Sequence, residues 1–158
     1  HGCENVVTLV TCGKALGCEG ALILAPTVLR DFLVNRGRSF IFSTAPSPLI
    51  AAIVRESLSI VAGADDRRER LRQIIEHAHG RLAPLGIPPS GTHIQPVPIG
   101  EDSRTMRIAE ALQARGFDIR GIRPPTVPAG TARLRVSLTL NIDEAAVSEL
   151  AIALEDLL

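Results

Sequence analysis

The chain has 158 residues, of which 46% are hydrophobic and 22% charged, and its 17 basic and 17 acidic side chains cancel. This composition predicts one globular domain or two small ones, with enough apolar surface to bury a core. A net charge of zero, with the arginines spread along the chain, argues against nucleic acid or an anionic membrane as a partner. No apolar run approaches the roughly 20 residues of a membrane span, so we expect a cytoplasmic protein.

Two short apolar runs, residues 5–10 and 20–25, are typical of strands that are buried on both faces. A Gly-rich connection between them carries Lys14, which is the one lysine among seventeen basic side chains. Arginine keeps its charge at physiological pH, whereas a partly desolvated lysine can lose its proton and form a Schiff base. We interpret Lys14 as a candidate catalytic residue, a solvated surface lysine being the alternative. The nearby hydroxyl of Thr11 suits a phosphate oxygen.

The next two elements lie between Pro26 and Ser43. Residues 26–36 place apolar side chains on one helical face, with proline near the first turn and Gly37 at the end, and this predicts a short amphipathic helix. Residues 39–43 alternate polar and apolar side chains, which predicts a brief strand.

Two longer helices follow. The first begins near Pro46 or Pro48, carries apolar residues at i, i+3, i+4 spacing and stops at Gly63. The second begins at Asp65 and Asp66, whose carboxylates favour the positive end of the helix dipole. Its apolar stripe contains Leu71, Ile74, Ile75, Ala78 and Leu82. Its four arginines, at positions 67, 68, 70 and 72, are expected to be a solvated face, with binding of coenzyme A phosphates as the alternative.

A Pro- and Gly-rich loop at 84–91 then changes the pattern to short alternating elements. We expect an edge or bulged strand at 92–99, a helix capped by Asp102 or Ser103 and ending at Gly116, and strands at 117–122 and 132–140. Asn141 with Glu144 resembles a capping box for a last helix. These elements predict an α+β unit with helices on one side of an open sheet. The predicted domains are residues 1–63 and 64–158.

Cysteine and histidine spacing predicts no metal site. Cys3, Cys12 and Cys18 form no Cys-x-x-Cys pair and have no histidine at zinc-ligand spacing, so we expect reduced thiols. His77 and His79 lie two apart on a predicted helix and therefore point to different faces. We interpret both as surface histidines.

The strand at 132–140 carries the clearest candidate substrate contact. Its alternation places Leu134 on the core side, and Arg133 and Arg135 together on the other face. A guanidinium on a rigid strand can donate two parallel hydrogen bonds to the carboxylate of an amino acid. A pair of exposed edge charges is the alternative. In the preceding loop, 123–130, prolines restrict the backbone around Arg123 and Thr126, which indicates either a preorganised site or simply a rigid loop.

Three segments, in one order, resemble the α-oxoamine synthases, which are fold-type I enzymes that use pyridoxal phosphate (PLP). They are Thr11–Gly17, Ser39–Thr44 and Gly121–Arg135. The resemblance implies an α/β chain: the C-terminal part of a PLP-transferase large domain with its connecting helix, followed by a small α+β domain with an antiparallel sheet. It also implies that the chain is the C-terminal portion of such an enzyme. The roles it implies are cofactor attachment and catalysis for Lys14, cofactor phosphate binding for Thr11, Ser43 and Thr44, and substrate binding for Arg135, Arg123 and Thr126.

The last segment is most similar to the branch of the family that makes a biotin precursor. That resemblance implies a decarboxylative condensation of L-alanine with a pimeloyl thioester, carried by coenzyme A or a carrier protein. It further implies PLP as cofactor and a homodimer with a shared active site, in which Thr44 reaches the cofactor of the neighbouring subunit. The alternatives are another branch, such as glycine C-acetyltransferase, or a non-catalytic α+β fragment that dimerises or binds a partner.

Overall fold

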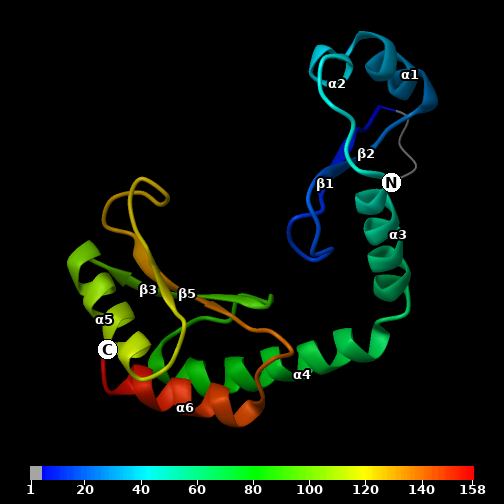
Figure 1. Cartoon of the computed structure of the whole chain (residues 1–158). Coiled ribbons are helices and arrows are strands. Elements are labelled where there is room, and N and C mark those ends of the chain that lie inside the picture. Colours follow the sequence, from blue (N-terminus) through cyan, green and yellow to red (C-terminus); the bar gives the residue numbers. More distant parts are fainter. Residues whose placement is uncertain (1–4) are drawn as a thin grey trace. The chain divides into compact units, whose positions relative to one another are not determined.

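The computed structural model describes residues 5–158, so Cys3, one of the three predicted thiols, lies outside the described residues. The chain divides into two compact units, one ending at Ala64 and one beginning at Asp65. Figure 1 shows the elements of each unit along the chain. Among the helices of residues 5–158, none is long and apolar enough to cross a membrane.

The first unit contains a two-stranded antiparallel ladder and three helices. The ladder pairs Thr8 with Leu24 at one end and Thr11 with Ala21 at the other, where the connecting loop lies. Its elements are β1 (Thr8–Thr11), β2 (Ala21–Leu24), α1 (Thr27–Arg36), α2 (Arg38–Ile41) and α3 (Pro48–Ala62).

The prediction that both strands are buried on both faces is wrong for this chain. Leu9 is 64% exposed and Leu24 is 56% exposed. The physical reason is that a ladder of two strands has two broad faces and few side chains to cover them. The buried cluster of this unit is small and contains Cys12, Leu16 and Val54.

The helix predicted at 26–36 is confirmed as α1, which follows Pro26 and ends where the Gly37 N–H donates to the Leu33 carbonyl at 2.8 Å. The strand predicted at 39–43 is wrong, because this segment forms the single turn α2. The Ile41 N–H bonds to the Gly37 carbonyl at 2.9 Å, and the Ser43 hydroxyl to the Ser39 carbonyl at 2.5 Å. Bonds within the segment therefore satisfy backbone groups that a strand would leave for a partner.

The predicted helix ending at Gly63 is confirmed as α3, in which Pro48 occupies the first turn. The Leu49 N–H donates to the Ser47 hydroxyl at 3.2 Å, so Ser47 caps this helix. Val54 is the buried residue of α3, and it faces the loop between β1 and β2.

The second unit has a three-stranded antiparallel sheet with the strand order β3-β5-β4. β3 is an edge strand whose register shifts between Pro98 and Gly100, as its prolines predicted. The elements of this unit are α4 (Asp65–Leu82), the 3₁₀ turn η1 (Ala83–Leu85), β3 (Ile94–Gly100), α5 (Asp102–Ala114), β4 (Arg120–Ile122), β5 (Ala132–Ser137) and α6 (Glu144–Glu155).

The core of the second unit lies between the sheet and its helices. Val97 and Leu134 of the sheet are fully buried, together with Ile74 of α4, Leu112 of α5 and Leu154 of α6. Figure 1 shows α5 beside the sheet and α6 along α4. The predicted α+β arrangement is therefore confirmed.

Helix starts in this unit differ from the predictions by one or two residues. Glu101, rather than Asp102 or Ser103, occupies the N-cap position of α5, and the Ser103 hydroxyl donates to its carboxylate. This bond is the main reason why the pKa of Glu101 is lowered. Asp143, rather than Asn141, caps α6 by accepting from the Ala146 N–H at 2.9 Å. The sequence pattern therefore located the start of each helix to within two residues but assigned the wrong N-cap residue.

The two histidines of α4 are half-buried, so the prediction that they lie at the surface is wrong. His77 Nε2 lies 2.9 Å from the Ser148 hydroxyl of α6. His79 Nε2 is buried without a partner among the residues that the structure describes. The His77 contact follows from the packing of α4 against α6, which periodicity alone does not reveal.

Candidate active site

Lys14 lies in a compact loop between β1 and β2 that is closed by backbone hydrogen bonds. The Cys12 N–H donates to the Gly20 carbonyl and the Cys18 N–H to the Cys12 carbonyl, both at 2.9 Å. The Gly17 N–H donates to the Lys14 carbonyl at 3.0 Å, which makes a tight turn around the lysine. Gly17 has φ +61°, a conformation that glycine adopts without steric cost. The loop therefore holds Lys14 on a defined backbone.

Two buried side chains and one hydroxyl fix this loop to α3. Cys12 is 1% exposed and Leu16 is 8% exposed, and both pack with Val54. The Ser57 hydroxyl donates to the Leu16 carbonyl at 3.0 Å. Sequence reasoning missed Leu16 and Ser57. Leu16 could have been found from the sequence, because it is an apolar residue in a segment otherwise rich in glycine. Ser57 could not, because it lies 41 positions away along the chain.

The side chains of Lys14 and Thr11 are exposed at the loop end of the ladder. The Lys14 amine makes no hydrogen bond or ion pair with any residue between 5 and 158. The partly desolvated lysine that the sequence suggested is thus not seen in this chain. The structure does bring Lys14 and Thr11 to one end of the ladder, as predicted.

Ser43 and Thr44 lie in the segment between α2 and α3. β2 runs from Ala21, next to the Lys14 loop, to Leu24, from which the chain enters α1 and then α2. Ser43 and Thr44 line a hollow with residues of α1 and α2. Neither lines the hollow beside the Lys14 loop, which Cys12, Gly20 and Pro46 border. Figure 1 shows α2 and the loop after β1 as separate parts of this unit.

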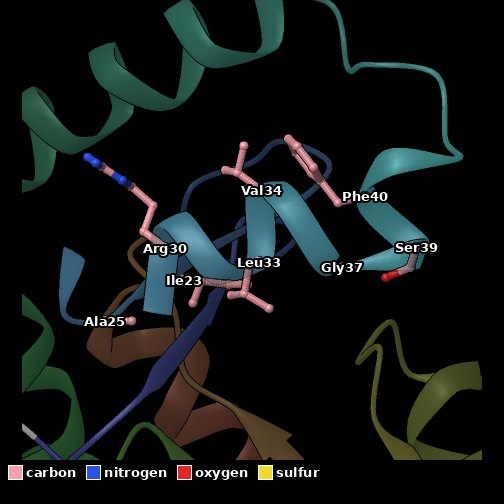
Figure 2. Close-up of a pocket in the computed structure, with 8 residues that line it drawn as sticks. All are labelled: Ile23, Ala25, Arg30, Leu33, Val34, Gly37, Ser39 and Phe40. Atoms are coloured by element: carbon pink, nitrogen blue, oxygen red, sulfur yellow. The ribbon is translucent and has the colours of Figure 1, made fainter. Parts of the chain in front are cut away.

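Apolar hollows surround the α1–α2 end of this unit. Ser43 and Thr44, with Phe40, line one of about 490 Å³. Another, of about 250 Å³, lies between β2, α1 and α2, and Figure 2 shows Ile23 and Leu33 at its floor with Phe40 above. Its lining is mainly aliphatic and aromatic, with Arg30 and Ser39 as its polar side chains. This end of the unit offers hydrophobic contact area rather than a charged site.

In the second unit, the alternation of β5 is as predicted. Leu134 is fully buried, whereas Arg135 is exposed and Arg133 half-buried on the opposite face. The Arg133 Nε donates to the Thr131 carbonyl at 3.0 Å. The Arg135 guanidinium makes no hydrogen bond or ion pair within the described part of the chain. Arg135 therefore carries an unpaired guanidinium on this sheet face, among the residues that the structure describes.

Sequence reasoning missed Arg120, which pairs directly with Arg135 across β4 and β5. Side chains at directly opposed positions share a face and lie close, and like charges there repel. Asp118 forms an ion pair with Arg120 at 2.7 Å and so offsets part of that repulsion. On the other side of Arg135 lies Pro96 of β3. Arg120 could be recognised as a neighbour of Arg135 only once the register of β4 and β5 was known.

Arg123 and Thr126 belong to one turn after β4. The Thr126 N–H donates to the Arg123 carbonyl at 3.0 Å, and both side chains are exposed. A cis peptide bond joins Pro124 and Pro125 within this turn. Arg123 comes directly after Ile122, which pairs with Arg133, so it lies beyond the end of the ladder. The structure thus brings Arg123 and Thr126 together and places them a few strand residues along from Arg135.

The chain belongs to the aminotransferase class I and II family, whose family model matches residues 1–154. Solved structures of this class share its fold. The serine palmitoyltransferase of Sphingomonas wittichii superposes with a TM-score of 0.84 at 21% identity, over 95% of this chain and 39% of that one. The predicted α/β fold of the type I PLP enzymes is thereby confirmed.

Within that class, curated relatives carry the name 8-amino-7-oxononanoate synthase. The relative from Chromobacterium violaceum is 42% identical over 139 residues, which is 86% of this chain and 36% of the relative. The one from Ralstonia pickettii is 42% identical over 160 residues, which is 96% of this chain and 39% of that relative. A solved synthase from Francisella tularensis superposes with a TM-score of 0.81 at 22% identity, over 96% of this chain and 45% of that one. The predicted resemblance is confirmed, and the chain spans about two fifths of the length of these curated relatives.

Proposed function

We propose that this protein acts as an 8-amino-7-oxononanoate synthase. The reaction is the decarboxylative condensation of L-alanine with a pimeloyl thioester of coenzyme A or a carrier protein, as in biotin biosynthesis. The observation that carries the proposal is 38–42% identity to synthases of that name over at least 86% of the chain. We further propose that it works in the cytoplasm.

The residues present fit PLP. Lys14 offers the one lysine amine of the chain, exposed on an anchored loop, and Thr11 offers a hydroxyl at the same end of the ladder. When bound, this cofactor supplies an electron sink that stabilises a carbanion beside the amino group of a substrate. Lys14 would hold the cofactor and, once released from it, accept the α-proton of the amino acid at Nζ. Thr11 would donate a hydrogen bond to the phosphate.

The arginine face of the second unit supports recognition of carboxylates. Arg135 would hold the carboxylate of L-alanine, because its guanidinium stands on a strand whose register is fixed by the buried Leu134. Arg123 and Thr126, which share a turn, would contact the carboxyl end of the pimeloyl group. An acyl chain that ends in a carboxylate needs a second cationic group, and Arg123 supplies one.

We also propose a homodimer in which Ser43 and Thr44 serve the cofactor phosphate of the other subunit. Support comes from the hollows of the first unit: Ser43 and Thr44 line one beside α1 and α2, and neither lines the one beside the Lys14 loop of their own chain. A dianionic phosphate needs donors from several directions, and Thr11 with nearby backbone amides covers one side.

Glycine C-acetyltransferase remains the second candidate, since the fold is shared with other acyltransferases such as serine palmitoyltransferase. It differs in taking a short acyl group without a terminal carboxylate. The turn that carries Arg123 favours the pimeloyl substrate. The third reading, a non-catalytic fragment that dimerises or binds a partner, predicts no attachment of cofactor to Lys14.

The test combines trapping with turnover in the full-length protein. Borohydride added with PLP makes the link between an aldehyde and a lysine amine permanent, and peptide mass spectrometry should then find the cofactor on Lys14. Product should form from L-alanine with a pimeloyl thioester, and much more slowly from glycine with acetyl-coenzyme A. The control is Lys14→Arg, which keeps the charge. Trapping at other amines alone, or wild-type turnover by Lys14→Arg, would contradict the assignment.

A further inference from the structure

Two cysteines flank the Lys14 loop, one on each side of the lysine. Cys12 and Cys18 are both free thiols in the structure. Neither thiol has a part in the proposed reaction. Their position at the two ends of one closed loop raises the question of what they could do as a pair.

The backbone holds the two cysteines within disulfide range. The Cys18 N–H donates to the Cys12 carbonyl at 2.9 Å, and standard bond lengths then keep the two Cα atoms within about 7 Å. Disulfides form at Cα separations below about that limit. The side chains also share surroundings, because Cys18 packs against the cluster formed by Cys12, Leu16 and Val54. The backbone separation and the shared cluster thus both place the two cysteines as neighbours.

The two thiols differ in access, as a sequential exchange requires. Cys18 is half-buried, and its Sγ lies 4.0 Å from the Ile50 carbonyl, so it is the more exposed residue of the pair. Cys12 is 1% exposed and lines a hollow of about 410 Å³ beside α3. A reagent should therefore meet Cys18 first, with Cys12 close behind it inside the protein.

We propose that Cys12 and Cys18 form a reversible disulfide by exchange with a low-molecular-weight disulfide such as oxidised glutathione. The Cys18 thiolate attacks one sulfur of that molecule, forms a mixed disulfide and expels the first glutathione thiolate. The Cys12 thiolate then attacks the Cys18 sulfur, forms the protein disulfide and expels the second. The two cysteine sulfurs lose two electrons, the glutathione disulfide gains them, and the released thiolates take up the two protons.

The disulfide would enclose Lys14 in a covalent ring of residues 12–18. The ring adds a covalent bond where a hydrogen bond between Cys12 and Cys18 already exists, so the loop keeps its shape on oxidation. Its motion is restricted instead. The site thus links the thiol redox state to the mobility of the lysine loop.

The test uses the protein with Cys3→Ser, which leaves Cys12 and Cys18 as the two cysteines of residues 1–158. The protein is equilibrated with glutathione buffers of increasing oxidised fraction, acid-quenched and analysed without reduction. We expect both thiols to disappear together, and the mass of the protein to fall by that of two hydrogen atoms. Trypsin cuts after Lys14, so the oxidised form should yield peptide 1–14 joined to peptide 15–30, and reduction should separate them.

Matched variants separate the ring from simple thiol oxidation. Cys12→Ala in the same background should end as a mixed disulfide on Cys18, and Cys18→Ala should keep its buried thiol reduced. Far-ultraviolet circular dichroism of each reduced variant checks that it folds like the parent. Retention of both thiols in the parent, glutathione adducts without the joined peptides, or a joined product only between two chains on a non-reducing gel would each overturn the proposal.

Discussion

Arg120 and Arg135 face each other across two paired strands, which is an unfavourable arrangement unless an anion lies between or above them. Asp118 forms an ion pair with Arg120 and offsets part of this repulsion, whereas Arg135 has no ion pair within residues 5–158. A carboxylate ligand at Arg135 would remove that imbalance. The local electrostatics therefore favour an anion at this point of the sheet.

Arg135→Lys should weaken the use of the amino-acid substrate. Lysine keeps the charge but cannot donate two parallel hydrogen bonds, so we expect a loss of about 1.5–3 kcal/mol, or roughly 10- to 150-fold in kcat/KM for L-alanine. The measurement is steady-state kinetics of the full-length protein with a saturating pimeloyl thioester.

Arg133→Lys is the matched control for this change, because Arg133 lies on the same face but bonds to the Thr131 carbonyl. It should alter kcat/KM less than threefold, and both variants should unfold at the wild-type temperature. Equal losses in the two variants would indicate that the general charge of this face, rather than Arg135, recognises the substrate.

Alternation within β5 was sufficient to predict which residues of this strand are buried and which arginines share a face. It could not reveal Arg120, because the pairing of two strands depends on register and on the length of the loop between them. In the same way, a glycine-rich loop after an apolar run was sufficient to single out Lys14, but the hydroxyl of Ser57 that fixes the loop comes from a distant helix. The roles of Lys14, Thr11 and Arg135 stay predictions.

At the scale of elements, the long helices and five of the predicted strands were found, whereas the strand at 39–43 and the burial of β1 and β2 were predicted wrongly. The helices α1, α3 and α4 extend over several turns, so their apolar spacing is repeated often enough to be unambiguous. The five residues at 39–43 offered too little periodicity, and local hydrogen bonds decided in favour of α2. The strands of the first unit are exposed because burial depends on what covers a ladder, which no single strand encodes.

The start of α6 gives a test at this scale. Asp143→Ala removes the side-chain acceptor of the Ala146 N–H, so we expect the free energy of unfolding to fall by about 1 kcal/mol. Asn141→Ala, at the residue that the sequence pattern favoured as the cap, should change it by less than about 0.5 kcal/mol. Urea unfolding followed by circular dichroism measures both, and a larger effect at Asn141 would show that the capping box forms after all.

The loop of Lys14 gives a second test. Leu16→Ala leaves a space beside Val54 and should destabilise the first unit by about 2–5 kcal/mol. Ser57→Ala removes one hydrogen bond to the Leu16 carbonyl and should cost about 1 kcal/mol. Hydrogen exchange read by mass spectrometry should show faster exchange at residues 12–20 in both variants. Unchanged exchange there in Leu16→Ala would mean that the loop is held by other contacts.

At the scale of the whole molecule, the two ends of the β1–β2 ladder are the decisive feature. One end carries Lys14 and Thr11, and the other leads to Ser43 and Thr44. The apolar side chains around the second end include Phe40 and Phe42, which are 61% and 75% exposed. Exposed aromatic side chains of this size are typical of a contact surface. A second copy of the chain, bound at this end, is the arrangement we propose.

The dimer proposal predicts complementation between two inactive or weakened variants. Thr44→Val removes one donor to the phosphate, so PLP should bind about 1–3 kcal/mol more weakly, or roughly 5- to 150-fold. In a mixture with Lys14→Ala, hybrid dimers should contain one site with an intact Lys14 and an intact Thr44 from opposite chains. Activity of the mixture should then exceed the sum of the two variants. Ser39→Ala serves as the control partner because its hydroxyl has no proposed role. If hybrids form, as native mass spectrometry can verify, and the activity of the mixture stays at that sum, then Thr44 acts in its own subunit or has no part in cofactor binding.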